Sequence, residues 1–214
     1  MAEAASGLRL EAVQVALRGR ALVELTLHIA PGEIAVVMGP SGSGKSTLLS
    51  AVCGTLDPSF AMSGRIVLDG RRIDTLPPER RGVGILFQDD LLFPHLSVGG
   101  NLAFGLPHEV KGRAARRARV EEALASADLA GLADRDPATL SGGQRARISL
   151  LRVLLFEPRA LLLDEPFSKL DTELRARFRA FVFEELHQRS LPALLATHDQ
   201  ADAEAAGGQV VTLG

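Results

Sequence analysis

A glycine-rich segment near the N-terminus, GPSGSGKS at residues 39–46, has the residue types and spacing of a phosphate-binding loop. Gly39, Gly42 and Gly44 let the backbone turn tightly and bring its N–H groups close to anionic oxygens. Lys45 adds a positive charge, and the Ser46 hydroxyl is a suitable ligand for Mg²⁺. A glycine-rich turn before an ordinary helix would share the glycines but not the whole pattern. The residues predicted to hold nucleotide phosphates are Gly39, Pro40, Ser41, Gly42, Ser43, Gly44, Lys45, Ser46 and Thr47.

Two adjacent carboxylates, Asp164 and Glu165, come directly after the apolar run 160–163. In open α/β sheets, ligands lie beyond the carboxyl ends of the strands, so a carboxylate pair at such an end would face the phosphates. We expect Asp164 to hold Mg²⁺ through water, and Glu165 to act as the general base that polarises the attacking water. The alternative is that Asp164 simply ends a strand and caps the next segment of the chain.

The pentapeptide LSGGQ at residues 140–144 precedes a segment of helical periodicity. Ser141 is a good N-cap residue, and Ile148, Leu151 and Leu155 would form an apolar stripe on a helix over 142–156. The N-terminus of that helix would present free N–H groups and a positive dipole to an anion. A capped helix with a purely structural role fits the same periodicity.

The segments around these motifs predict an α/β fold. The apolar, β-branched run 33–38 before the loop is typical of a buried parallel strand, and residues 46–53 can continue as a helix. Residues 8–30 and 64–73 predict an antiparallel β patch. Further strands are expected to end at Asp164 and His198 and to include residues 209–213.

Helices are predicted for most of the segment 89–158, which prolines interrupt. A second amphipathic helix is expected after Asp171 as its N-cap, with Leu174, Phe178, Phe181 and Leu186 facing inward.

Taken together, these motifs resemble the ATP-binding subunit of an ABC transporter, from about Leu8 to the C-terminus. The resemblance implies an α/β fold with a P-loop NTPase core and mainly parallel sheet, an N-terminal antiparallel β patch and an inserted helical lobe. It implies one ABC ATPase domain over 1–214, in which 1–88 and 159–214 form the ATP-binding core and 89–158 form a helical subdomain. ATP and Mg²⁺ are the implied ligands.

The resemblance also implies roles for single residues. Signature residues Ser141, Gly142, Gly143 and Gln144 would reach across a head-to-tail dimer to the γ-phosphate of ATP held by the second chain. Gln88 resembles the Q-loop glutamine, so the implied Mg²⁺ site contains Ser46, Gln88 and Asp164, and the implied catalytic residues are Glu165, His198, Lys45 and Gln88. His198 resembles the switch histidine, and Asp171 the D-loop aspartate that crosses the dimer interface. Lys169 occupies a position that the family often gives to a small residue.

One position departs from the family pattern. The family usually stacks adenine on an aromatic residue upstream of the phosphate loop, but the chain has no Tyr and no Trp, and its first Phe is Phe60. We hypothesise that Leu17 covers the adenine ring, or that the flat guanidinium of Arg18 or Arg20 stacks on it.

Composition narrows the class of protein without identifying it. A chain of 214 residues with 46% hydrophobic content can bury one good core, and its net charge of −2 gives no indication of nucleic-acid binding. The single cysteine, Cys53, excludes an internal disulfide and suits a reducing compartment. No apolar run approaches the ~20 residues that span a bilayer, and the N-terminal segment lacks the apolar region of a signal peptide. Any membrane attachment must therefore come through a partner. The resemblance implies a peripheral protein at the cytoplasmic face of the cell membrane.

The segment 87–101 resembles importer subunits of the kind that serve thiamine, ferric iron, molybdate or polyamines. The resemblance implies three kinds of partner: a second copy or a paralogous ATPase subunit, transmembrane permease subunits, and a solute-binding protein reached through the permease. Phe93, Pro94 and Leu96 would then be exposed apolar residues that contact the permease. The alternatives are a soluble ABC-type ATPase with a non-membrane partner, an interaction module that binds ATP without hydrolysing it, and, less compatible with LSGGQ, a small-molecule kinase.

Overall fold

The computed structural model describes residues 6–214, which divide into two compact units. The core unit comprises the chain up to Ile85, Arg159–Glu165 and Phe183–Gly214, and the helical unit comprises Leu86–Pro158 and Pro166–Val182. These boundaries lie close to the predicted ones at 88 and 158. Residues 166–182 differ, because the sequence assigned them to the ATP-binding core and their contacts group them with the helical unit.

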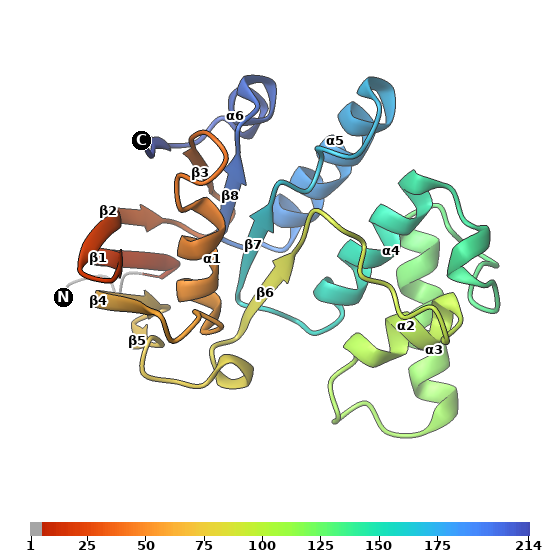
Figure 1. Ribbon diagram of the computed structural model, residues 1–214. Coiled ribbons are helices and arrows are strands. Elements are labelled where there is room, and N and C mark those ends of the chain that lie inside the picture. Colours follow the sequence, from red (N-terminus) through yellow and green to blue (C-terminus); the bar gives the residue numbers. More distant parts are fainter. Residues whose placement is uncertain (1–5) are drawn as a thin grey trace. The chain divides into compact units, whose positions relative to one another are not determined.

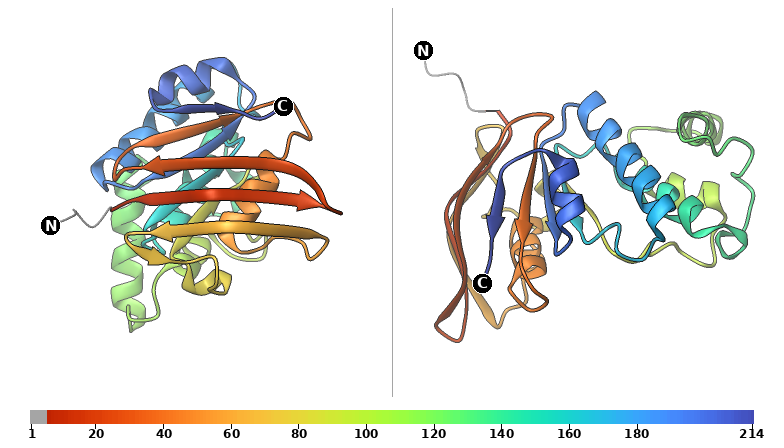
Figure 2. Two further views of the ribbon diagram at one scale, coloured as in Figure 1. Left: turned by 90° about the vertical axis from the view of Figure 1, so that its left-hand side faces the viewer. Right: turned by 90° about the horizontal axis from the view of Figure 1, so that it is seen from above.

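An antiparallel sheet in the order β2-β1-β4-β5 forms one layer of the core unit (Figure 2). Along β2, buried residues alternate with exposed ones from Val23 to Ile29, so one face packs inward. Arg18 and Gly19, with φ of 50° and 81°, form the two-residue turn between the first two strands. The strands are β1 (Leu8–Leu17), β2 (Arg20–Ile29), β4 (Phe60–Leu68) and β5 (Arg71–Arg72).

β4 begins at Phe60, earlier than the predicted start at residue 64. The reason is a β-bulge, because the register of β1 against β4 shifts between Glu11 and Gln14. Gly64 faces this bulge with φ of 89°, and a Cβ on it would lie 2.3 Å from the Ala12 carbonyl oxygen. A glycine required by a bulge inside the strand therefore resembles, in sequence, the start of a strand.

The second sheet of the core unit has the order β6-β7-β8-β3-β9, and β7, β8, β3 and β9 run parallel (Figure 1). Its central strands are buried apolar runs, as expected for strands covered on both faces. α1 packs between the two sheets and contacts β1, β7 and β8, whereas α6 contacts β3 and β8. This arrangement confirms the predicted α/β fold. The elements are β3 (Ile34–Met38), α1 (Lys45–Cys53), β6 (Val83–Leu86), β7 (Ala160–Asp164), β8 (Ala193–Thr197), α6 (Gln200–Ala206) and β9 (Val210–Thr212), with a 3-10 turn at Pro78–Arg80.

The helical unit is built around a separate apolar cluster that includes Val98, Leu102, Leu124, Ile148 and Leu151. α4 ends at Leu154, two residues before the predicted end. Leu155 is partly buried and packs against this cluster, as predicted. Its helices are α2 (Val98–Gly105), α3 (Arg113–Ser126), α4 (Gly142–Leu154) and the first part of α5 (Thr172–Gln188), with a 3-10 turn at Pro137–Thr139.

The last carbonyls of α1 are bound by one buried side chain, Arg81. Its guanidinium donates to the carbonyls of Ala51 at 2.8 Å and Val52 at 2.9 Å, and also to those of Leu76 at 2.9 Å and Asp74 at 3.0 Å. A cation at a helix C-terminus also matches the negative end of the helix dipole. Arg81 therefore fixes the C-terminal end of the helix that begins directly after the glycine-rich loop.

Replacing Arg81 with methionine is expected to lower the free energy of unfolding by about 3 kcal/mol, because four carbonyls lose a charged donor in a buried place. Urea denaturation followed by circular dichroism measures this. Arg81→Lys, which keeps the charge but not the planar fork, should lie between wild type and Arg81→Met. Equal stability of Arg81→Met and wild type would contradict the role.

Candidate functional site

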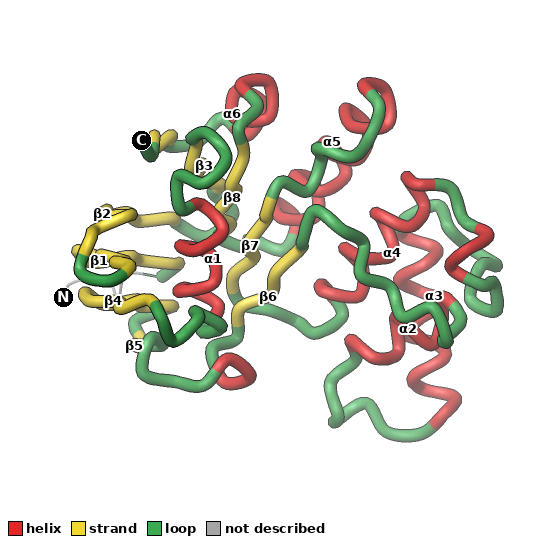
Figure 3. The backbone as a smooth tube through the Cα atoms, viewed as in Figure 1, coloured by secondary structure: helices red, strands yellow, loops and turns green. Residues whose placement is uncertain are grey.

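The predicted phosphate-binding loop connects β3 to α1 (Figure 3). Gly44 is the N-cap of α1 and has φ of 96°, a conformation that residues with a side chain rarely adopt. A Cβ on Gly39 would lie 2.5 Å from the Ser43 hydroxyl and 2.6 Å from the Leu213 carbonyl. Both glycines are therefore required by the shape of the loop itself.

Two polar groups of this loop are oriented as a phosphate site requires. Lys45 is 5% exposed, and its ammonium donates to the carbonyls of Gly39 at 2.8 Å and Pro40 at 3.0 Å, so its charge lies within the curve of the loop. The Ser43 hydroxyl is buried and has no hydrogen-bond partner among the residues that the structure describes. Buried hydroxyls normally have one, so the loop fits an added acceptor or donor such as a phosphate oxygen.

Ser46 and Asp164 meet beside the loop, where the Ser46 hydroxyl donates to Asp164 Oδ1 at 3.0 Å. Burial raises the pKa of Asp164 above its ordinary value and Glu165 raises it further, whereas the Ser46 hydrogen bond and Lys45 lower it. A partly buried carboxylate of this kind gains from a neighbouring cation. Hydroxyl and carboxylate oxygens are also the ligands that Mg²⁺ takes alongside nucleotide phosphates, so these two residues fit that ion.

Glu165 lies between two of the predicted catalytic residues. Its carboxylate is 3.6 Å from the Lys45 ammonium and 3.1 Å from His198 Nδ1. Its φ of 46° is unusual for a residue with a side chain, and its N–H donates to the Ala196 carbonyl on β8. Such strain costs on the order of 1–3 kcal/mol and is typical of functional sites. The core unit thus brings together Lys45, Ser46, Asp164, Glu165 and His198.

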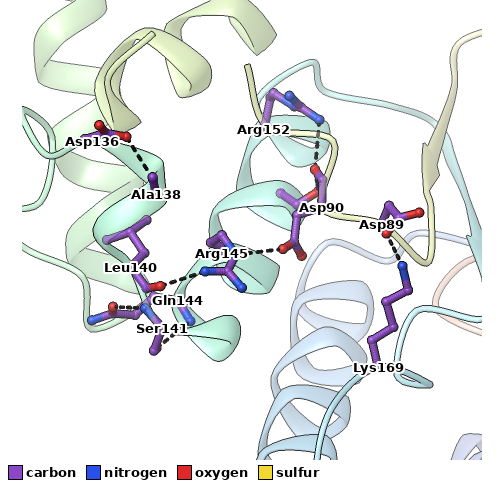
Figure 4. Close-up of polar contacts among 11 residues, drawn as sticks. Asp89, Asp90, Asp136, Ala138, Leu140, Ser141, Gln144, Arg145, Arg152 and Lys169 are labelled. Carbon is purple, nitrogen blue, oxygen red and sulfur yellow. Dashed lines mark hydrogen bonds and ion pairs between the residues drawn. The ribbon is translucent and has the colours of Figure 1, made fainter. Parts of the chain in front are cut away.

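The signature segment lies in the helical unit and begins α4 (Figure 4). Ser141 is the N-cap, as predicted, and a complete capping box forms, because the Gln144 side chain accepts from Ser141 N at 2.9 Å and Ser141 Oγ accepts from Gln144 N at 3.2 Å. Gly143 is buried, and a Cβ on it would lie 2.9 Å from Leu174 Cδ2. The first turn of α4 therefore presents backbone N–H groups at a fixed, glycine-lined helix end.

Two other predicted residues, Gln88 and Asp171, also lie in the helical unit. Gln88 is exposed, two residues after β6, and lines a cavity of about 300 Å³ together with Asp89, Gly142 and Lys169. Asp171 accepts a hydrogen bond from Leu174 N at 3.0 Å, which confirms it as the N-cap of α5.

Sequence reasoning missed several residues around this cavity. Lys169, noted in the sequence for its unusual position, forms an ion pair with Asp89 (Figure 4). Asp90 is bound by three side chains of α4, at Arg145, Ser149 and Arg152. The spacing of these three residues, four and then three apart, indicates one polar face of a helix and was the available signal.

The residues proposed to replace an adenine-stacking aromatic lie at the turn between β1 and β2. Leu17 is partly buried, whereas Arg18 and Arg20 are exposed. Val23, on β2, reaches the loop, because its Cγ2 atom would be 2.7 Å from a Cβ on Gly44.

A glycine-rich loop at the start of a helix, beside a carboxylate pair at the end of a parallel strand, defines a P-loop nucleoside triphosphatase. A model of the ABC transporter family matches residues 22–168. The chain therefore belongs to the ABC transporter family, whose ATP-binding subunits hydrolyse ATP, and the resemblance indicated by its motifs is confirmed.

Three relatives illustrate the match. The uncharacterized ABC transporter ATP-binding protein YnjD of Escherichia coli is 50% identical over 186 residues, which cover 87% of this chain and 85% of that protein. The Fe(3+) ions import ATP-binding protein FbpC of Streptomyces avermitilis is 45% identical, over 96% of this chain and 59% of the relative. The sulfate/thiosulfate import ATP-binding protein CysA of Synechocystis is 39% identical, over 90% of this chain and 54% of the relative. The chain thus spans most of YnjD but little more than half of these import proteins.

Proposed function

We propose that this chain is the ATP-hydrolysing subunit of a solute importer, in which closure of a dimer around MgATP drives a membrane permease. The observation that carries the proposal is the convergence of Lys45, Ser46, Asp164, Glu165 and His198 in one unit, with an intact LSGGQ helix start in the other. Import is the activity in the names of FbpC and CysA, and it supports the same direction here.

Each residue of the site has a separate role in ATP hydrolysis in this proposal. Residues 39–47 hold the phosphates, with Lys45 as the neutralising charge. Ser46 and Asp164 would hold Mg²⁺, which when bound stabilises the charge that develops on the phosphate oxygens. Gln88 is proposed as a further ligand on the strength of the resemblance alone. Glu165 takes a proton from the attacking water, and His198, in contact with Glu165, orients that carboxylate and contacts the γ-phosphate.

The signature residues Ser141, Gly142, Gly143 and Gln144 act, in this proposal, on ATP held by a second copy or a paralogous subunit. Asp171 lies at the same interface. The helix start fits this role, because its free N–H groups and dipole favour an anion. Residues 1–88 and 159–214 would bind ATP, and residues 89–158 would supply the signature.

Contact with the permease is proposed for an apolar patch on the helical unit, which comprises the exposed Leu91, the exposed Phe104 and the partly buried Phe93 that packs against Phe104. Leu91 is 55% and Phe104 69% exposed, and the Phe93 and Phe104 rings lie edge to face with centroids 4.8 Å apart. The sequence prediction named Phe93, Pro94 and Leu96 as exposed. Pro94 is exposed, whereas Phe93 and Leu96 are partly buried. Phe93 packs against Phe104 and the Arg152 guanidinium.

The proposal places the chain at the cytoplasmic face of the cell membrane through such a partner. No helix within residues 6–214 is long and apolar enough to cross a membrane.

Purification of the tagged chain from gently solubilised native membranes, with mass spectrometry of the co-purifying proteins, tests the proposal. We expect a multi-span permease, with or without a solute-binding protein, and a loss of most of that permease from Phe104→Ser. A matched change at an exposed phenylalanine outside the patch, Phe156→Ser, should retain it. Recovery only in the soluble fraction with a non-membrane partner would support the alternative, a soluble ABC-type ATPase.

A further inference from the structure

The peptide group that joins Leu140 to Ser141 is held at both ends. Its carbonyl, on Leu140, accepts a hydrogen bond from Arg145 Nη1 at 2.7 Å, and its N–H, on Ser141, donates to Gln144 Oε1 at 2.9 Å (Figure 4). Fixing this peptide plane fixes the direction of the Ser141 side chain and of the first free N–H groups of α4. Arg145 and Gln144 therefore set the orientation of the signature turn.

Arg145 is itself held by a carboxylate that lies far away in sequence. Its Nε donates to Asp90 Oδ2 at 3.2 Å, and the side chains of Arg145 and Asp90 are 39% and 32% exposed. One planar guanidinium thus bridges a carboxylate and a backbone carbonyl, a geometry that a lysine ammonium does not reproduce. Asp90 lies two residues beyond Gln88, so the bridge links the segment after Gln88 to the signature turn.

The backbone of this segment is fixed to the same helix face. Ser149 Oγ donates to the Asp90 carbonyl at 2.8 Å, and Arg152 Nη1 donates to the Leu91 carbonyl at 2.8 Å. Leu91 has φ of 47°, an unusual conformation for a leucine that these contacts maintain. These hydrogen bonds attach the backbone of residues 90 and 91 to α4, and so they hold Asp90 at a defined position beside Arg145.

We infer that Arg145 is a positioning residue for the signature turn and that Asp90 holds the Arg145 side chain in place. A change in the segment after Gln88 then alters how this chain binds the γ-phosphate held by a second chain. This rests on the proposed function, because the signature acts only in the ATP-bound dimer. Such coupling needs a contiguous physical link between the two segments, and the Asp90–Arg145–Leu140 contacts form one.

The test uses the Glu165→Gln chain, which is expected to keep ATP bound, and measures its dimer dissociation constant in MgATP by analytical ultracentrifugation. Adding Arg145→Met should raise this constant about tenfold, because a charge-assisted hydrogen bond at the signature is lost. The affinity of the monomer for a fluorescent ATP analogue should change less than about twofold, because residues 39–47 are untouched. If Arg145 only stabilised the fold, its replacement would weaken dimerisation and ATP binding by the monomer together.

Three further variants sharpen the result. As a single change, Asp90→Asn should raise the dimer dissociation constant. Added to Arg145→Met it should raise that constant little further, because both changes break the same Asp90–Arg145 contact. Arg117→Met, which breaks a bidentate ion pair with Asp134 at 3.1 and 3.0 Å in the same unit, should leave it unchanged. Arg145→Lys should be intermediate, and it carries the test if Arg145→Met does not fold.

The outcomes separate the inference from the function on which it rests. A dimerising Glu165→Gln parent whose constant is unchanged by Arg145→Met or Arg145→Lys would overturn the inference alone. A parallel fall in monomer ATP affinity would overturn it as well, because Arg145 would then support the fold rather than the turn. A parent that stays monomeric in saturating MgATP would overturn the proposed dimer and, with it, the inference.

Discussion

Glu165→Gln is expected to lower the ATPase rate by about 10²- to 10⁴-fold, the range that general-base catalysis typically supplies. Glutamine keeps the shape of the side chain but cannot accept the proton of the attacking water. Because Lys45, Ser46 and the loop glycines are unchanged, ATP should still bind, and the variant should accumulate as an ATP-bound dimer. Phosphate release measures the rate, and size-exclusion chromatography with MgATP measures the dimer.

The control for this variant is Glu204→Gln, which neutralises an exposed carboxylate on α6 of the same unit and should leave the rate unchanged. Retention of more than a tenth of the wild-type rate in Glu165→Gln would contradict the assignment of the general base. A variant that hydrolyses no ATP and yet remains monomeric would leave the base in place and count against dimer closure.

The motifs proposed to carry the chemistry could be located in the sequence because each depends on neighbouring residues. The loop at 39–46, the carboxylate pair Asp164–Glu165 and the capped helix at Ser141 all consist of neighbouring residues whose types match one backbone geometry. The strands before the loop and the carboxylate pair are short apolar runs with no competing helical period, so their placement at the carboxyl edge of a parallel sheet could be inferred.

Contacts between distant residues could not be predicted in this way. Arg81 and Arg145 resemble any other arginine in sequence, and the carbonyls that they bind become neighbours only when the chain folds. The positive φ of Glu165 likewise leaves no mark in sequence, because that conformation is imposed on a residue type that does not favour it. Phe104 was missed as an exposed residue because its predicted helix carries no polar face to show which side meets water.

Asp164→Asn is expected to lower ATPase activity strongly and to stabilise the fold at the same time. Its folded-state pKa is raised, chiefly by burial, above the value of about 3.9 for an unfolded chain. For a raised pKa, the stabilising contribution is present below the unfolded value and is lost as pH rises through the folded value. At pH 8 the ionised Asp164 therefore weakens the fold, and a neutral asparagine, whose Oδ1 can still accept from Ser46, should be more stable than wild type.

This difference in stability should shrink as pH falls through the raised pKa of Asp164, because the carboxyl group then becomes neutral. Urea denaturation at a series of pH values from 4 to 8 measures this difference. Asp57→Asn is the control: hydrogen bonds from Ser59 lower the pKa of Asp57, so this variant should be less stable than wild type at pH 8. ATPase activity of Asp164→Asn should fall roughly 10²-fold or more, since a bound metal ion contributes several kcal/mol to charge stabilisation. A variant less stable than wild type at pH 8 would contradict the cause given for the pKa. A stable variant with normal activity would show instead that Asp164 is not a ligand, so the two measurements separate what burial does to this carboxylate from what the carboxylate does for catalysis.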